Sequence, residues 1–159
     1  MLFRSYNQLA WKLRQDERVI NMEKQNIRTI TAEQLGELVD FISIDVAFIS
    51  LDKVLPVATT LLKNTGSLVA LIKPQFEAGK EKVGKGGIVR ERAVHEEVLS
   101  RILQVAYDCK LYLHGLTFSP IKGTEGNIEF LGYFTKSEEG ALSITNELIT
   151  AVVDEAHML

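Results

Sequence analysis

The sequence predicts an α/β fold built on a mostly parallel sheet, with one antiparallel strand at or near an edge. Two apolar, β-branched runs, 39–46 and 67–72, are each followed by a helical pattern. This alternation is typical of parallel strands joined by crossover helices. Their weak polar alternation predicts strands buried on both faces. Two more strand-like segments, 111–118 and 127–134, flank the turn-forming sequence SPIKGTEG, so the last strand should run antiparallel.

The remaining elements follow from apolar spacing and from residues that start or stop helices. Helical spacing predicts four helices, over 5–15, 52–63, 91–107 and 138–157. Gly66 is expected to end the second of them. Residues 18–22 are expected to form a short strand. Thr31 and Gln34 match a capping box, which predicts a short helix before the strand at 39–46.

Composition indicates one globular domain and excludes several classes of protein. The chain has 159 residues, of which 46% are hydrophobic and 25% charged, and its formal net charge is −3. One cysteine permits no intramolecular disulfide and favours a reducing, cytoplasmic location. The three histidines have no metal-binding spacing, so no metal is expected. No apolar run reaches the roughly 18–20 residues of a membrane span, and the first residues do not resemble a signal peptide.

Charged residues follow the ends of the predicted strands. Asp45 lies at the end of the first buried strand and Lys73 directly follows the second. Ligands of open α/β sheets bind at the carboxyl ends of parallel strands. An antiparallel last strand would begin at that edge, which brings Glu129 there too. We therefore expect Asp45, Lys73 and Glu129 to converge.

A lysine between two carboxylates stays charged and can donate a hydrogen bond to an oxygen that is losing its proton. The alternative is that these residues are solvated strand ends, or form an ion pair of small structural value.

The long connection after Lys73 is rich in glycine and basic residues. It is interpreted either as an anion-binding cradle or as a flexible surface loop. Its basic residues, Lys80, Lys82, Lys85 and Arg90, supply a local positive charge that would suit an anion. Asn26, just after the predicted strand at 18–22, is interpreted either as part of a polar loop or as a contact for the adenosine of a ligand. Trp11 is expected in the core, and His95 is expected to be solvated.

Several segments together resemble the TlyA family, also called haemolysin A. They are NQLAWKLRQDERV, IDVAFISL, ALIKPQFEAGKEKVGKGGIVR, VHEEVL and EGNIEFLGY. The family consists of S-adenosylmethionine-dependent ribosomal RNA methyltransferases with an FtsJ-like catalytic domain. The resemblance implies a Rossmann-like methyltransferase fold and 2′-O-methylation of a ribose, without a metal. Asp45, Lys73 and Glu129 match three members of its Lys-Asp-Lys-Glu tetrad, and Asp45 is also expected near the cofactor.

The sequence also departs from the family pattern. It lacks the S4-like RNA-binding domain, the glycine-rich cofactor loop and the first tetrad lysine. We therefore expect residues 1–159 to be a partial methyltransferase domain without the first two strands of the sheet, with a C-terminal helix over 138–157. An open sheet edge would favour self-association. The resemblance implies ribosomal RNA or a ribosomal subunit as the partner, with RNA contacts from Lys80, Lys82, Lys85 and Arg90. It implies S-adenosylmethionine as the cofactor, with Asn26 as a candidate contact.

Two other functions remain as alternatives. The missing cofactor loop favours a catalytically inactive RNA-binding or interaction module. The older family name suggests a membrane-lytic haemolysin, but the sequence has neither a spanning segment nor a strongly basic amphipathic helix.

Overall fold

The fold is a four-stranded mixed sheet flanked by helices. The structure, a computed structural model, describes residues 9–158. The strand order is β1-β2-β4-β3, where the strands are β1 (Val39–Ile44), β2 (Leu62–Ile72), β3 (Tyr112–Phe118) and β4 (Phe130–Thr135). Strand β1 runs parallel to β2, whereas β4 is antiparallel to both β2 and β3. The predicted α/β class, with a single antiparallel strand near an edge, is confirmed.

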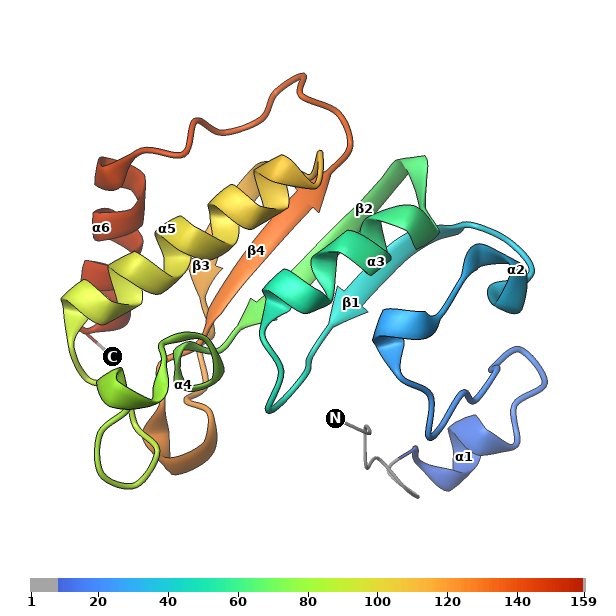
Figure 1. The fold of residues 1–159 in the computed structure, drawn as a ribbon, viewed down its shortest axis with the longest axis horizontal. Helices are drawn as coiled ribbons and strands as arrows, with labels where there is room; N and C mark the ends of the chain where they lie inside the picture. Colours follow the sequence, from blue (N-terminus) through green and yellow to red (C-terminus); the bar gives the residue numbers. More distant parts are fainter. Residues whose placement is uncertain (1–8, 159) are drawn as a thin grey trace.

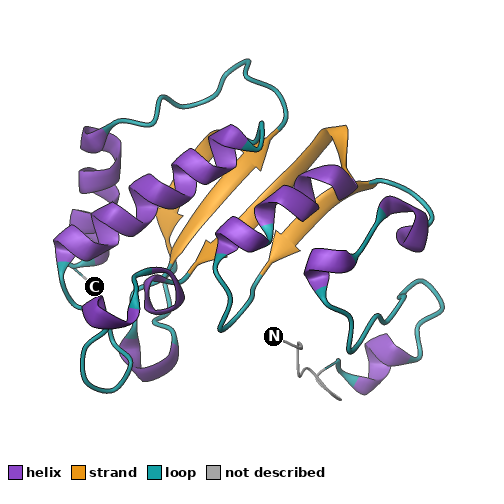
Figure 2. Ribbon diagram, in the orientation of Figure 1, coloured by secondary structure: helices purple, strands orange, loops and turns teal. Residues whose placement is uncertain are grey.

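Helices α3 and α5 lie across one face of this sheet, and α6 lies alongside α5 (Figures 1 and 2). The α-helices of the described residues are α1 (Trp11–Arg14), α2 (Ala32–Leu35), α3 (Leu55–Leu61), α4 (Pro74–Glu77), α5 (Arg92–Asp108) and α6 (Asn146–Ala156). Four short 3-10 helices lie between them, η1 (Ile27–Thr29), η2 (Leu51–Lys53), η3 (Lys80–Lys82) and η4 (Thr124–Gly126). The capping box predicted at α2 is present, because Thr31 and Gln34 exchange both hydrogen bonds.

The main core lies between the helices and one face of the sheet. Leu68 and Ile72 of β2 pair with Phe134 and Phe130 of β4, and all four side chains are fully buried. The opposite face is more open, since Tyr133 is 40% exposed and Phe41 is 55% exposed. The prediction that β1 and β2 are buried on both faces is therefore wrong. Strand residues alternate between a covered and an open face.

The segment before β1 differs most from expectation. Residues 18–22 form no strand. Arg18 bonds instead to Asp16 through its backbone N–H and guanidinium, and these local bonds favour a turn over a sheet ladder. The helix expected over 5–15 begins only at Trp11, although residues 5–8 lie outside the described part. Trp11 is 69% exposed, which corrects its expected core position.

Two predicted helix boundaries are also wrong. Gly66 does not end a helix but lies within β2. A Cβ at this position would come within 2.9 Å of the Asp40 carbonyl oxygen on β1, so only glycine permits this close approach. The helix predicted over 138–157 begins only at Asn146, because Thr145 caps it by accepting a hydrogen bond from the Leu148 N–H. The preceding loop contains Gly140 at a φ of +76°.

Strand β1 is an edge strand of the described sheet. The predicted self-association through an open edge therefore has a candidate location, and it stays a prediction.

A buried histidine joins the ends of α5 and α6. His95 is fully buried, so its expected solvation is wrong. Its Nδ1 lies 2.9 Å from Nε2 of His157, and its ring packs edge-on against Phe130 with the ring centroids 5.5 Å apart. Burial, followed by the proximity of His157, lowers the pKa of His95 to about 4.

This histidine should make the stability of the fold sensitive to acid. Between its ordinary pKa of 6.5 and the folded value of about 4, the unfolded chain binds more protons. The free energy of unfolding should therefore fall as pH decreases through this window, by up to about 1.4 kcal/mol per pH unit from this residue. His95→Gln should reduce the slope, measured by urea unfolding between pH 4 and 7.

An equal slope in the wild type and in His95→Gln would contradict the assignment to His95.

Candidate active site

Asp45 and Lys73 follow the ends of neighbouring parallel strands, β1 and β2. Their parallel register, which pairs Ile44 with Ala70, brings both strand ends to the same edge of the sheet. The Lys73 Nζ lies 2.5 Å from Asp45 Oδ1. The lysine side chain is only 15% exposed, whereas that of the aspartate is 72% exposed. The structure thus places a largely enclosed ammonium against a carboxylate that faces solvent.

Glu129 reaches the same edge from the antiparallel strand. Because Ile72 pairs with Phe130, continuing the register by one residue sets Lys73 opposite Glu129. The glutamate is buried, at 7% exposure. Its Oε1 accepts a hydrogen bond of 2.8 Å from Nε2 of Gln75. Among the described residues it forms no ion pair with Lys73.

The sequence therefore placed all three residues at one edge, and the structure refines their contacts. Lys73 contacts Asp45 directly. Glu129 contacts Gln75, two residues beyond Lys73 along the chain. The lysine and the two carboxylates form a row across β1, β2 and the start of β4, rather than a lysine held between both acids.

Glu77 holds in place the loop that follows β1 and helix α4, which adjoin Asp45 and Lys73. Its carboxylate accepts hydrogen bonds from the Ser50 hydroxyl at 2.6 Å and from the Leu51 N–H at 2.8 Å. The Arg101 guanidinium of α5 binds the same carboxylate at 2.8 Å. The Glu77 side chain is 2% exposed, and a buried charge needs such partners. This network ties the chain after β1 and helix α4 to the rigid helix α5.

Asn127 joins the two long loops at this edge. Its Oδ1 accepts the Val89 N–H at 3.0 Å, and its Nδ2 donates to the carbonyl oxygens of Gly87 and Thr124 at 3.0 and 2.9 Å. Asn127 is 2% exposed, and three hydrogen bonds nearly exhaust the capacity of its side chain. Figure 1 shows the loop from α4 to α5 beside the loop between β3 and β4. The glycine-rich connection is thus anchored at its base.

The basic residues of this connection divide into two groups. Lys82 is paired with Glu97 of α5, with Nζ 2.5 Å from Oε1. Lys80, Lys85 and Arg90 are exposed and, within residues 9–158, form no ion pair. Three of the four residues predicted to contact RNA are therefore exposed basic side chains without a carboxylate partner among the described residues.

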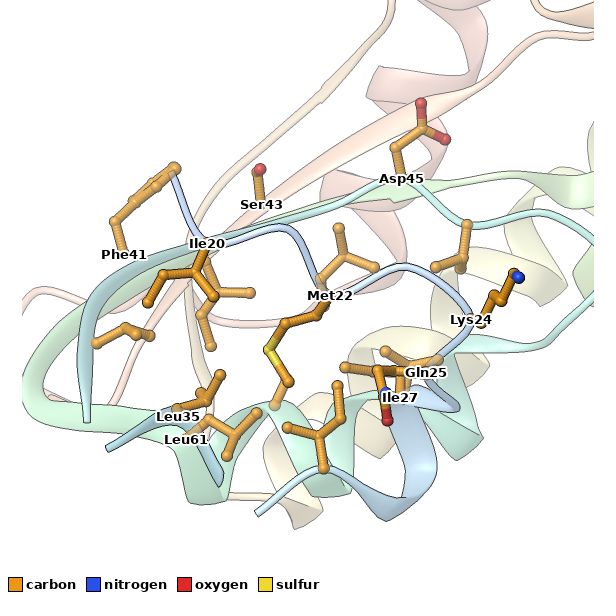
Figure 3. Close-up of a pocket in the computed structure, with 17 residues that line it drawn as sticks. Ile20, Met22, Lys24, Gln25, Ile27, Leu35, Phe41, Ser43, Asp45 and Leu61 are labelled. Atoms are coloured by element: carbon orange, nitrogen blue, oxygen red, sulfur yellow. The ribbon is translucent and has the colours of Figure 1, made fainter. Parts of the chain in front are cut away.

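A cavity of about 680 Å³ lies beside Asp45, between β1 and the segment before it. Figure 3 shows Met22, Leu35 and Leu61 on one side of β1, while Ser43 and Asp45 point to the other. Gln25 and Ile27 also line the cavity, but Asn26 between them does not. The Asn26 side chain instead accepts a hydrogen bond from the Arg28 N–H at the start of η1. Its predicted cofactor contact stays a prediction.

Residues 9–158 contain no cluster of three or more histidine, cysteine, aspartate or glutamate side chains that suits a metal ion. Within the same residues, no helix is long and apolar enough to cross a membrane.

The sequence reasoning missed three residues of this edge. Gln75 lies two positions after Lys73, and Asn127 two positions before Glu129. Both could have been found from the sequence by looking for polar side chains next to the predicted charged residues. Gly123 packs against the Glu129 carboxylate across a loop, and no local pattern signals that contact.

Comparison with known proteins shows the family of this chain. The profile described as FtsJ-like methyltransferase matches residues 4–136. The chain belongs to the FtsJ-like methyltransferase family. Its relatives also identify it with the TlyA group of that family. The predicted resemblance is confirmed.

Three relatives illustrate the match. "Putative rRNA methyltransferase YqxC" of Bacillus subtilis is 51% identical, over 96% of this chain and 55% of that protein. "16S/23S rRNA (cytidine-2'-O)-methyltransferase TlyA" of Mycobacterium tuberculosis is 37% identical, over 87% of this chain and 52% of that protein. The solved structure "Putative hemolysin from Streptococcus thermophilus" has a TM-score of 0.88 and 46% identity, over 96% of this chain and 55% of that one. The chain thus spans about half the length of the curated relatives it matches.

Gly123 gives a specific way to displace Glu129. Its φ of −72° suits alanine, but an added Cβ would overlap the Glu129 carboxylate. Gly123→Ala should therefore leave the unfolding free energy within about 1 kcal/mol of wild type, since the flexible end of the side chain can move. Any methyl transfer that depends on the position of Glu129 should fall about 100-fold, because a misplacement of about 1 Å is that costly.

Gly115→Ala is the control, because its added Cβ would make only ordinary contacts, 3.6 Å from Tyr133. Both variants are assayed for transfer of labelled methyl groups and for urea unfolding. Full activity in Gly123→Ala would show that the position of Glu129 is unimportant.

Proposed function

We propose that this protein catalyses S-adenosylmethionine-dependent 2′-O-methylation of a ribose in ribosomal RNA. The observation that carries the proposal is the Lys73–Asp45 pair, with Glu129 on the adjoining strand at one edge of the sheet. The name of the Mycobacterium tuberculosis relative, an rRNA (cytidine-2'-O)-methyltransferase, supports the same chemistry.

Lys73 has the properties needed beside a hydroxyl that must lose its proton. Its Nζ is anchored to Asp45 at 2.5 Å and has three N–H groups, so at least one is left for a substrate oxygen. The low exposure of its side chain limits competition from water and strengthens its electrostatic effect. In this role Lys73 donates a hydrogen bond to the 2′-oxygen and stabilises the negative charge that develops there.

Asp45 holds the Lys73 side chain in place through its direct contact with Nζ. Glu129 lies on the opposing strand and is itself held by Gln75. The ion pair with Asp45 would thus orient the ammonium group, and Glu129 places a second carboxyl group at the same edge of the sheet.

The residues present fit part of an S-adenosylmethionine site. The cavity beside Asp45 has a suitable size for a nucleoside-sized ligand, and its lining is mostly apolar with Lys24, Gln25, Ser43 and Asp45 as polar residues. When bound, this cofactor supplies a methyl group on a positively charged sulfur.

The exposed residues Lys80, Lys85 and Arg90 would contact the phosphates of the RNA. The loop that carries them is fixed at its base by Asn127, which reduces the ordering needed on binding. A ribosomal substrate implies that the reaction takes place in the cytoplasm.

Lys73→Ala should lower the rate of methyl transfer by about 10²–10³-fold, since it removes the donor to the reacting oxygen. Binding of S-adenosylmethionine, measured by calorimetry, should change little. Assays use the natural gene product with ribosomal RNA and labelled cofactor.

Lys63→Ala is the matched control. Lys63 also joins β2 to β1 through an aspartate, with Nζ 2.8 Å from Asp40 Oδ1, but at the other end of the strands. Its loss should leave the rate unchanged. Undiminished activity in Lys73→Ala would refute the role of this lysine. Absence of cofactor binding by the wild type would instead favour the inactive RNA-binding module.

The basic loop gives a separate prediction for RNA affinity. Replacing Lys80 and Lys85 together with alanine should weaken RNA binding and reduce the slope of log K against log salt by about 1–2. Lys82→Ala should have a smaller effect, because Glu97 already neutralises this lysine. Equal salt slopes in the double variant and the wild type would show that the loop is a solvated surface segment that does not contact the RNA.

A further inference from the structure

Gln75 makes a contact that the proposed chemistry does not yet use. It is the second residue of α4, and it follows Lys73 by two positions. Its Nε2 donates a hydrogen bond of 2.8 Å to Glu129 Oε1. Its Oε1 is buried and has no hydrogen-bond partner among the described protein groups.

The orientation of this amide follows from the chemistry of its partner. An ionised carboxylate only accepts hydrogen bonds, so the amide nitrogen must face Glu129 and the amide oxygen must point away. A buried acceptor without a donor disfavours the folded state. An apolar side chain of similar size would avoid that cost. The contact with Glu129 is therefore the feature that distinguishes glutamine from an apolar residue here.

Glu129 is confined on a second side as well. The backbone at Gly123 packs so closely on its carboxylate that even one added carbon would overlap it. The carboxylate thus lies between the Gln75 amide and the Gly123 backbone. Gln75 lies in helix α4, which is fixed through Glu77 to α5, so the contact with Glu129 is supported by a rigid element.

We propose that Gln75 is a positioning residue for methyl transfer, which acts by holding the Glu129 carboxylate at the edge occupied by Lys73. This inference rests on the proposed function for its effect on rate. The Gln75–Glu129 contact itself is open to measurement without any activity.

Gln75→Glu tests the contact because it keeps the shape and changes the charge. Two carboxylates at hydrogen-bond distance cannot both ionise readily, so they share one proton at neutral pH. One shared proton preserves the hydrogen bond between the two side chains. At higher pH the second ionisation forces the carboxylates apart. Lys73, Asp45, Lys122 and Glu125 are the charged residues of the adjoining strand ends and loop, and all four are unchanged in the variant.

The experiment compares Gln75→Glu with Gln104→Glu. Gln104 also donates to a carboxylate, with Nε2 2.9 Å from Asp108 Oδ1, but both residues are exposed on α5. In Gln75→Glu, methyl transfer should resemble wild type near pH 6 and decline on the alkaline side at a lower pH than wild type. Gln104→Glu should keep the wild-type pH profile. Gln75→Leu, which removes the contact at every pH, should lower kcat about 100-fold with little change in KM for RNA.

The unfolding free energy of the same variants tests the Gln75–Glu129 contact without any measurement of activity. A proton retained in the folded Gln75→Glu variant stabilises it at low pH, and this stabilisation is lost as pH rises. Its unfolding free energy should therefore fall between roughly pH 5 and 8, relative to wild type and to Gln104→Glu. Parallel stability and activity profiles in all three proteins would overturn the proposal. An inactive wild type with the expected stability difference would refute the proposed function and leave the Gln75–Glu129 contact established.

Discussion

The antiparallel insertion of β4 between β2 and β3 is the constraint on which the site depends. Because β4 runs against β2, its first residues lie where β2 ends, and Ile72 faces Phe130. A parallel strand in that position would begin at the other end of the sheet. The reversal therefore brings Glu129 to the edge at which β1 and β2 deliver Asp45 and Lys73. One choice of strand direction assembles three distant segments.

The surrounding contacts preserve this arrangement rather than create it. Glu77 ties the loop after β1 and helix α4 to α5, and Asn127 joins the two loops beyond the strands. Both side chains are nearly inaccessible to water and make at least three hydrogen bonds. Buried polar groups with satisfied partners favour one geometry over alternatives. This edge of the sheet thus combines exposed side chains, such as Asp45, with rigid supporting contacts.

Much of this arrangement could be predicted from the sequence, because it follows from strand order. The two buried runs, the turn before β4 and the charged residues at the strand ends were sufficient to place Asp45, Lys73 and Glu129 together. The contacts between their side chains were harder to predict from the sequence. The reach of Lys73 to Asp45 and of Gln75 to Glu129 depends on side-chain conformations and on the bulk of neighbouring loops, which a single sequence does not specify.

The failures have physical causes that a local pattern does not show. Trp11 and the segment 18–22 have the composition of buried elements, but Trp11 is exposed and Arg18 bonds locally to Asp16. Gly66 has the composition of a helix end, but the approach of β1 determines its role. His95 follows a charged first turn, yet α6 returns from far along the sequence to cover it. In the last two cases a tertiary contact overrode a local signal.

We propose that the edge of the sheet with Asp45, Lys73 and Glu129 directs a methyl group to a ribose hydroxyl. The most direct measurement is to incubate the natural gene product with S-adenosylmethionine and ribosomal RNA, digest the RNA, and locate the added methyl group by mass spectrometry. The account predicts a methyl group on a ribose 2′-oxygen, which also makes the adjoining phosphodiester resistant to alkali. A methyl group on a base would contradict the account, because the Lys73–Asp45 pair is arranged to assist a hydroxyl.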